Sequence, residues 1–214
     1  ADTAAFRRKL QLPDKTAPEW LLFGYNSPVW CDWLEMWCRH GEPVTLLLPG
    51  SRIIDSLKNG GNIPPQALMQ PGESFQTASV TLTRIPFVPQ RDFDRLLPLA
   101  DGLMVRGEDS FVRAQLSGKP FFWHIYPQEE MVHLDKLDAF WQKAYAGYPA
   151  EIQAAHQALS QELNGGHRLD ETQRLAAWQT LQQHFASWQK AAGVWKDWLF
   201  AQPSATEKLA KFMQ

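Results

Sequence analysis

The segment at residues 101–126, DGLMVRGEDSFVRAQLSGKPFFWHIY, restricts the possible folds more than any other part of this 214-residue chain. An apolar run ending at Val105 is followed by the turn Arg106-Gly107, and an amphipathic stretch then extends to Gly118. A second apolar run ends at Tyr126. This order of strand, turn, helix, turn and strand predicts a βαβ unit whose two strands are parallel.

The residues before this unit show the same alternation of short apolar runs with helical patterns. This predicts an α/β protein with a Rossmann-like, doubly wound parallel sheet. The expected strands are residues 20–25, 44–48, 79–85, 103–105 and 120–125; the other expected helices are 28–40, 51–58 and 90–97, and 62–73 is expected to be a loop.

After residue 127 the strand patterns stop, and helical periodicity covers residues 129–145, 150–163 and 170–196. We therefore expect a start or linker at 1–19, a Rossmann-like core at 20–128, and C-terminal helices at 129–214 that pack on it. An aromatic stripe marks the last helices and favours core packing. Its members are Trp178, Phe185, Trp188, Trp195 and Trp198.

Composition excludes several classes of protein. No apolar run approaches the roughly 18–20 residues that a membrane-spanning helix needs, so we expect no membrane segment. The net charge of −2 gives no electrostatic reason to expect nucleic-acid binding. Cys31 and Cys38 lie seven positions apart in one expected helix, too far for a disulfide, which favours a cytoplasmic location. The start, without Met or an apolar signal core, suggests a fragment of a longer chain.

Familiar catalytic motifs are not found. The chain has no Walker loop, no GxGxxG, no GxSxG and no Cys-x-x-Cys. Its six histidines show no ligand spacing on a shared face, so each is interpreted as a solvated or core residue and no metal site is expected.

Polar and aromatic side chains gather instead at the ends of the expected strands, which meet at one edge of a parallel sheet. These candidates are Tyr25 and Asn26 after the first strand; Phe87, Gln90 and Phe93 after the third; Arg106, Glu108, Asp109 and Ser110 after the fourth; and Tyr126, Gln128 and Glu129 after the fifth. Together they suit a nucleotide: rings for a base, an amide for its edge, a carboxylate for ribose hydroxyls, and a helix N-terminus with an arginine for phosphate.

Each candidate also has a simpler interpretation. Phe87 and Phe93 suit an ordinary core, and Glu108-Asp109-Ser110 suits a helix cap. Tyr25 suits a buried strand, and Arg106 could pair with Asp101. The shared sheet edge is what favours a binding site over these separate explanations.

Four motifs resemble the elongation factor P arginine rhamnosyltransferases. They are FGYN at 23–26, FVPQRDFDRLL at 87–97, VRGEDSFVRAQ at 105–115 and KPFFWHIYPQ at 119–128. The resemblance implies one half of a GT-B fold: the C-terminal half, which binds the donor dTDP-rhamnose. It implies further that the helices at 129–214 pack toward the N-terminal half as well as on the core. It also implies an inverting transfer of rhamnose to an arginine of elongation factor P, which would be bound mainly by the N-terminal half.

The family's donor pocket falls on Tyr25, Phe87, Gln90, Phe93, Arg106, Glu108, Asp109, Ser110 and Tyr126. Sugar contacts are expected from Asn26, Gln128 and Glu129. The family's aspartate bases belong to the N-terminal half, and no segment here matches that region. The resemblance therefore implies no catalytic base in this chain, no metal and no other cofactor, and a fragment that is inactive alone. A GT-B-like sugar-nucleotide epimerase and a non-enzymatic nucleotide-binding module remain alternatives.

Overall fold

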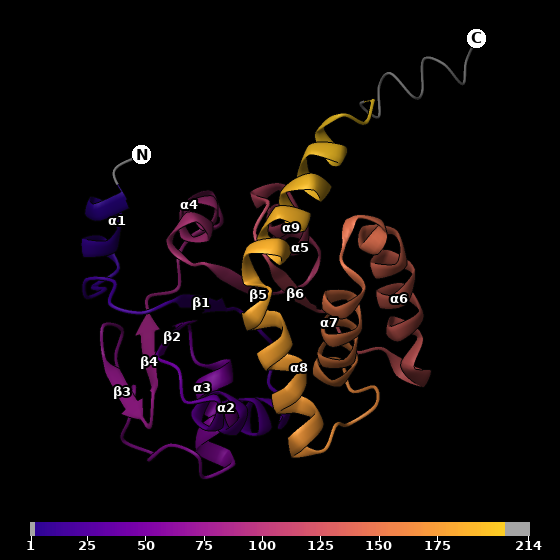
Figure 1. Cartoon of the computed structure of the whole chain (residues 1–214). Coiled ribbons are helices and arrows are strands. Elements are labelled where there is room, and N and C mark those ends of the chain that lie inside the picture. The colour runs from indigo at the N-terminus through magenta and orange to yellow at the C-terminus, as the bar shows by residue number, and fades with distance from the viewer. Residues whose placement is uncertain (1–2, 204–214) are drawn as a thin grey trace.

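In the computed structural model, residues 3–203 form an α/β fold in which helices flank a six-stranded sheet (Figure 1). The strand order is β3-β4-β2-β1-β5-β6, and every neighbouring pair is parallel except β3 with β4. The strands are β1 (Glu19–Leu22), β2 (Val44–Pro49), β3 (Ser74–Thr77), β4 (Val80–Ile85), β5 (Gly102–Arg106) and β6 (Phe121–His124). The predicted Rossmann-like sheet is thus confirmed.

Helices α2 and α3 lie on one side of the sheet, and α4 and α5 on the other (Figure 1). The helices of the core are α2 (Val29–His40), α3 (Arg52–Asn59), α4 (Gln90–Leu96) with the short η1 (Leu97–Leu99), and α5 (Glu108–Ser117). The later ones are η2 (Glu129–Met131), α6 (Val132–Ala144), η3 (Tyr145–Gly147), α7 (Ala150–Leu163), α8 (Glu171–Gln183) and α9 (Phe185–Phe200).

The structure differs from the sequence prediction in several places; the first strand, predicted at 20–25, ends at Leu22. Residues 74–77 form an antiparallel edge strand, β3, that was not predicted. Within the stretch predicted as a linker lies a helix, α1 (Thr3–Lys9), whose Phe6 is buried and whose Arg7 binds Glu19 at 2.7 Å. The helix predicted at 170–196 is two helices, α8 and α9, separated at His184. Residues 1–2 of the predicted linker and 204–214 of the predicted C-terminal part lie outside the described residues.

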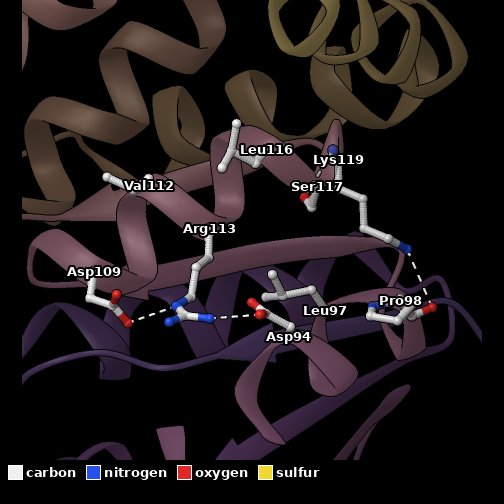
Figure 2. A pocket seen from close by; sticks show the side chains of 9 residues that line it. All are labelled: Asp94, Leu97, Pro98, Asp109, Val112, Arg113, Leu116, Ser117 and Lys119. Atoms are coloured by element: carbon white, nitrogen blue, oxygen red, sulfur yellow. Dashed lines mark hydrogen bonds and ion pairs between the residues drawn. The ribbon is translucent and has the colours of Figure 1, made fainter. Parts of the chain in front are cut away.

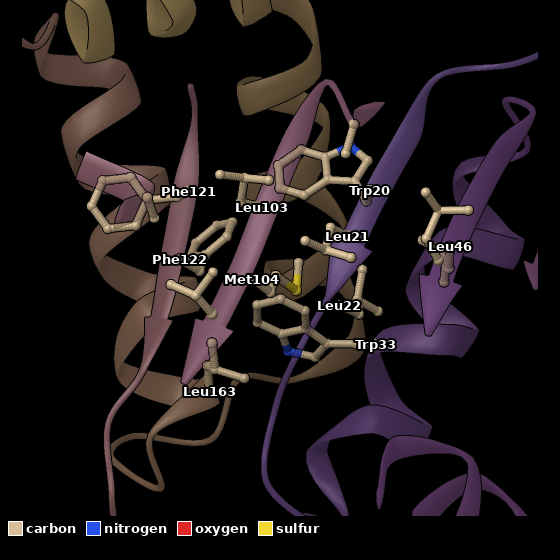
Figure 3. Packing of buried hydrophobic residues seen from close by; sticks show 14 of the residues in the cluster. Trp20, Leu21, Leu22, Trp33, Leu46, Leu103, Met104, Phe121, Phe122 and Leu163 are labelled. Carbon is tan, nitrogen blue, oxygen red and sulfur yellow. The ribbon is translucent and has the colours of Figure 1, made fainter. Parts of the chain in front are cut away.

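One hydrophobic core joins the sheet to the later helices (Figure 3). Trp20 of β1 packs against Trp178 of α8 at 5.2 Å between ring centroids and against Trp188 of α9 at 5.8 Å. Trp195 is also buried, whereas Trp198 is 39% exposed and stacks on Trp195. The aromatic stripe is therefore largely core, and it fixes α8 and α9 on the sheet.

Two expectations from composition can be compared with the described residues. Cys31 and Cys38 are free. Across residues 3–203, no helix has the length and apolar character needed to cross a bilayer.

Candidate functional site

The order in which strands are added to the sheet changes side at β1, which is therefore its topological switch point. From β1 the chain adds β2 and then β4 on one side, and it later adds β5 and β6 on the other. The connections after β1 and β5 therefore diverge at their carboxyl ends, and in open α/β sheets ligands bind in the crevice formed there. The strands stay paired up to this point, because the Phe23 N–H donates to the Met104 carbonyl at 2.8 Å.

The loop after β1 presents Tyr25 with a firmly held backbone. Its N–H donates to Nδ1 of His124 at 3.2 Å, and its carbonyl accepts from Nε1 of Trp30 at 2.8 Å. Burial lowers the pKa of His124 to about 4, so this ring stays neutral and can accept the hydrogen bond. The Tyr25 ring packs edge-on against the exposed Tyr126 at 5.6 Å between centroids.

The turn after β5 depends on Gly107. Its φ of 67° and ψ of −170° lie in a region that only glycine adopts readily. A Cβ at this position would lie 3.5 Å from the Tyr25 hydroxyl, and the Gly107 carbonyl accepts from Nε1 of Trp123 at 3.0 Å. The turn thus brings the N-terminus of α5, with the free N–H groups of its first turn, beside Tyr25.

Arg106 lies above two aromatic rings in this crevice. Its guanidinium carbon is 4.4 Å from the Phe23 ring centroid and 5.1 Å from that of Tyr25. Its Nη1 is buried without a hydrogen-bond partner among the described residues. The alternative pairing with Asp101 is not formed, since Asp101 binds Lys15 at 2.7 Å. Burial lowers the pKa of Arg106, but an arginine remains charged at neutral pH.

The acidic residues at the start of α5 are engaged by neighbouring cations. Glu108 binds Lys136 of α6 at 2.7 Å. Asp109 accepts a hydrogen bond from Arg113 at 2.8 Å, and Arg113 also binds Asp94 at 2.7 Å. These three residues line a neighbouring pocket of about 560 Å³ (Figure 2). The hydrogen bond from Arg113 lowers the pKa of Asp109, which therefore stays ionised.

The candidates for base binding differ in accessibility. Phe87 is 66% exposed, whereas Phe93 is 8% exposed. Both rings pack against Phe23: the distance between ring centroids is 6.2 Å for Phe87 and 5.6 Å for Phe93. Gln90 begins α4, and its hydrogen bond to Asp109 also lowers the pKa of that carboxyl. Of these two rings, the exposed Phe87 is the one accessible for stacking.

The candidates for sugar binding lie at the ends of two loops. Asn26 donates from Nδ2 to the carbonyl of Arg52 at 3.2 Å. Gln128 donates its N–H to Nδ1 of His133 at 3.2 Å, and Glu129 begins the short helix η2. The side chains of Gln128 and Glu129 are exposed.

Some of the predicted site residues line one crevice of about 290 Å³, where the connections after β1 and β5 diverge. Its lining includes the predicted Tyr25, Arg106, Glu108, Asp109 and Ser110, together with Phe23, Arg52 and Gly107, which were not predicted as site residues. Asn26, Phe87, Gln90, Phe93, Tyr126, Gln128 and Glu129 are not among its lining residues. Arg52 directly follows the Gly50-Ser51 turn after β2, so the strand-end rule that selected the others also applies to it.

The fold and the crevice define a Rossmann-like α/β domain with a site suited to an anionic ligand. The family model described as "Elongation-Factor P (EF-P) rhamnosyltransferase EarP" matches residues 1–214. The chain therefore belongs to this family.

Named relatives agree with that assignment. A protein-arginine rhamnosyltransferase from Neisseria meningitidis is 64% identical over 212 residues, covering 99% of this chain and 56% of the relative. One from Pseudomonas aeruginosa is 35% identical over 191 residues, covering 89% and 49%. A solved structure described as "Structural basis for EarP-mediated arginine glycosylation of translation elongation factor EF-P" has a TM-score of 0.82 and 32% identity, covering 99% of this chain and 65% of that one. This chain spans about half the length of the curated relatives it matches.

Proposed function

We propose that this chain is the donor-binding, C-terminal half of a GT-B protein-arginine rhamnosyltransferase and that its crevice binds dTDP-rhamnose. The whole enzyme would transfer rhamnose, with inversion, to an arginine of elongation factor P in the cytoplasm. The family membership and the printed names of the relatives support the reaction class and the acceptor. Neither nucleic acid nor membrane has a part in this proposal.

One observation carries the donor-binding proposal. The buried Nη1 of Arg106 has no hydrogen-bond partner among the described residues, and it lies in a crevice that also receives the N-terminus of α5. An unsatisfied buried donor on a cation is costly, and a phosphate oxygen would satisfy it. The free N–H groups at the start of α5 attract the same group. A nucleoside diphosphate therefore suits this crevice.

The remaining candidates would then surround the donor. Glu108 would hold the ribose hydroxyls, and Asp109, Ser110, Tyr25 and Tyr126 would lie along the diphosphate. The thymine would stack on Phe87 beside Phe93 with Gln90 at its edge, and Asn26, Gln128 and Glu129 would approach the sugar. Arg106 and the N-terminus of α5 supply positive charge for the diphosphate, so we propose donor binding without metal or other cofactor.

The proposed reaction is a single displacement. The arginine guanidinium of the acceptor attacks the anomeric carbon from the side opposite the diphosphate, which leaves with the bonding electrons. Because a guanidinium is almost fully protonated in water, the nucleophile needs a carboxylate beside it. Asp109 is a poor base, since Arg113 lowers its pKa and occupies one of its oxygens. We therefore assign the base to the N-terminal half of the enzyme.

Binding of the donor is tested by titrating the isolated chain with dTDP-rhamnose, dTDP and UDP-glucose in the absence of divalent cations, followed by amide chemical shifts. The proposal expects shifts at residues 106–110, with dTDP-rhamnose and dTDP bound more tightly than UDP-glucose. Equal affinity for dTDP and dTDP-rhamnose would favour the nucleotide-binding module. Absence of binding by dTDP would refute the proposed site.

A transfer assay separates the two enzymatic alternatives. The isolated chain should not glycosylate elongation factor P, and adding the N-terminal half, in trans or by fusion, should restore transfer. An epimerase would instead release a free sugar product from the full-length protein without acceptor. Transfer by this chain alone would mean that a base lies among its own residues, with Asp109 and Glu129 the first to test.

A further inference from the structure

A second arginine faces the crevice from the other side of β1. Arg52 is the first residue of α3, which begins two residues after the end of β2. Strand β2 is the neighbour of β1 on the side away from β5. It lines the same crevice as Arg106 and Tyr25. The loop that carries Tyr25 therefore lies between two guanidinium groups that come from different strand ends.

The backbone contacts of Arg52 tie it to that loop. Its carbonyl accepts from Nδ2 of Asn26 at 3.2 Å and from Oγ of Ser56 at 3.0 Å. Ser56 Oγ also accepts from the N–H of Ser27 at 3.1 Å. The start of α3 and the Tyr25 loop are thus held together, and a ligand beside Tyr25 lies within the region that the Arg52 side chain can reach.

No carboxylate of the described chain neutralises this second arginine. Residues 3–203 show no ion pair at Arg52, and the acids of the crevice, Glu108 and Asp109, are bound by Lys136 and Arg113. Burial lowers the pKa of Arg106, and the charge of Arg52 adds to that lowering. Burial raises the pKa of Tyr25, and the charges of Arg106 and Arg52 oppose that rise, so the charge of Arg52 acts inside the crevice. Two like charges that share a crevice favour an anion between them.

We propose that Arg52 is a second diphosphate-binding residue, which binds the anion from the α3 side while Arg106 binds it from the α5 side. This inference rests on the proposed function. The two guanidiniums would distribute over the two phosphates, so the crevice would select a nucleoside diphosphate over the monophosphate or the free nucleoside. The side chain of Arg52 is exposed and can close onto the ligand when it binds.

The test uses isothermal titration of the chain with dTDP, dTMP and thymidine. Arg52→Gln should weaken dTDP binding by roughly 10- to 100-fold, the usual effect of losing a charge-assisted hydrogen bond, and weaken thymidine binding little. Arg52→Lys should retain part of the dTDP affinity, because it keeps the charge but not the planar fork. Lys58→Gln removes one charge from the far end of the same helix and should leave dTDP affinity unchanged.

The outcomes distinguish this inference from the proposed function. If the unmodified chain fails to bind dTDP, the proposed function fails. If it binds dTDP and Arg52→Gln binds equally well, only the role of Arg52 is refuted. A similar loss for dTDP and thymidine, or a similar loss in Lys58→Gln, would also refute it. Thermal unfolding of each variant shows whether the fold is retained.

Discussion

The buried ion pair between Arg174 and Glu162 is expected to be among the most sensitive points of the fold. Arg174 donates from Nε and Nη2 to the carboxylate at 2.8 Å and 2.6 Å, and the two side chains are 6% and 2% exposed. Glu162 also accepts from Nε1 of Trp33 at 2.9 Å and from the N–H of Leu169 at 2.9 Å. Replacing the arginine by methionine would keep much of the volume and leave the carboxylate buried without its cation. This typically costs about 3–5 kcal/mol.

A matched control lies a few residues away. Arg168 binds Asp32 at 2.9 Å, but its side chain is 76% exposed, so Arg168→Met should lower the free energy of unfolding by no more than about 1 kcal/mol. Urea unfolding followed by tryptophan fluorescence compares the two variants. Equal unfolding midpoints for Arg174→Met and Arg168→Met would refute the argument from burial. A double variant, Arg174→Met with Glu162→Gln, should regain part of the loss, because no charge remains buried and the amide oxygen can still accept from Trp33 or Leu169.

Three further predictions concern the proposed site and the pH dependence of the free energy of unfolding. Glu108→Ala should weaken dTDP-rhamnose binding by roughly 10- to 100-fold in a folded protein, as measured by calorimetry; unchanged affinity would contradict the ribose assignment. Phe87→Ala should lower dTDP affinity at unchanged stability, since the ring is exposed, whereas Phe93→Ala should also cost about 3–5 kcal/mol in unfolding free energy, since the ring is buried. Burial lowers the pKa of His124 and His156 from 6.5 to about 4, so folding favours their neutral forms. Their contribution to stability should be complete above pH 6.5 and decline towards pH 4; equal unfolding free energies at pH 7 and pH 5 would count against it.

The sequence predicted those elements whose pattern is local. Four of the parallel strands, β1, β2, β5 and β6, are mostly apolar, as expected of strands buried on both faces, whereas β4 alternates apolar with polar residues. By contrast β3 is a four-residue edge strand that alternates exposed with half-buried positions and has no apolar run to reveal it. Asp170, the residue before α8, forms a capping box with Gln173, whereas no Gly or Pro marks the change from α8 to α9 at His184.

The strand-end rule selected part of the crevice and missed three of its lining residues, Phe23, Arg52 and Gly107. Gly107 was read only as part of the turn after the expected fourth strand. Phe23 was assigned to the first strand, because the apolar run continues past Leu22, where β1 ends. Arg52 was read only as part of a helix that Ser51 begins. The pairing of Asp109 with Arg113 follows a helical spacing of four residues and can be inferred from sequence. The pairing of Glu108 with Lys136 joins residues 28 positions apart, and it depends on the packing of α6 against the start of α5.

The distribution of charge in this crevice favours the binding of an anion over proton transfer. Its acids, Glu108 and Asp109, already have cationic partners, whereas its cations, Arg52 and Arg106, have no carboxylate partner among the described residues. A general base needs a free lone pair and a pKa near the working pH, and the contact with Arg113 moves Asp109 away from both conditions. An anion binder needs the opposite arrangement, with unsatisfied donors in a fixed place, and the buried Nη1 of Arg106 meets that need. This asymmetry supports the proposal that the base which activates the acceptor arginine comes from outside this chain.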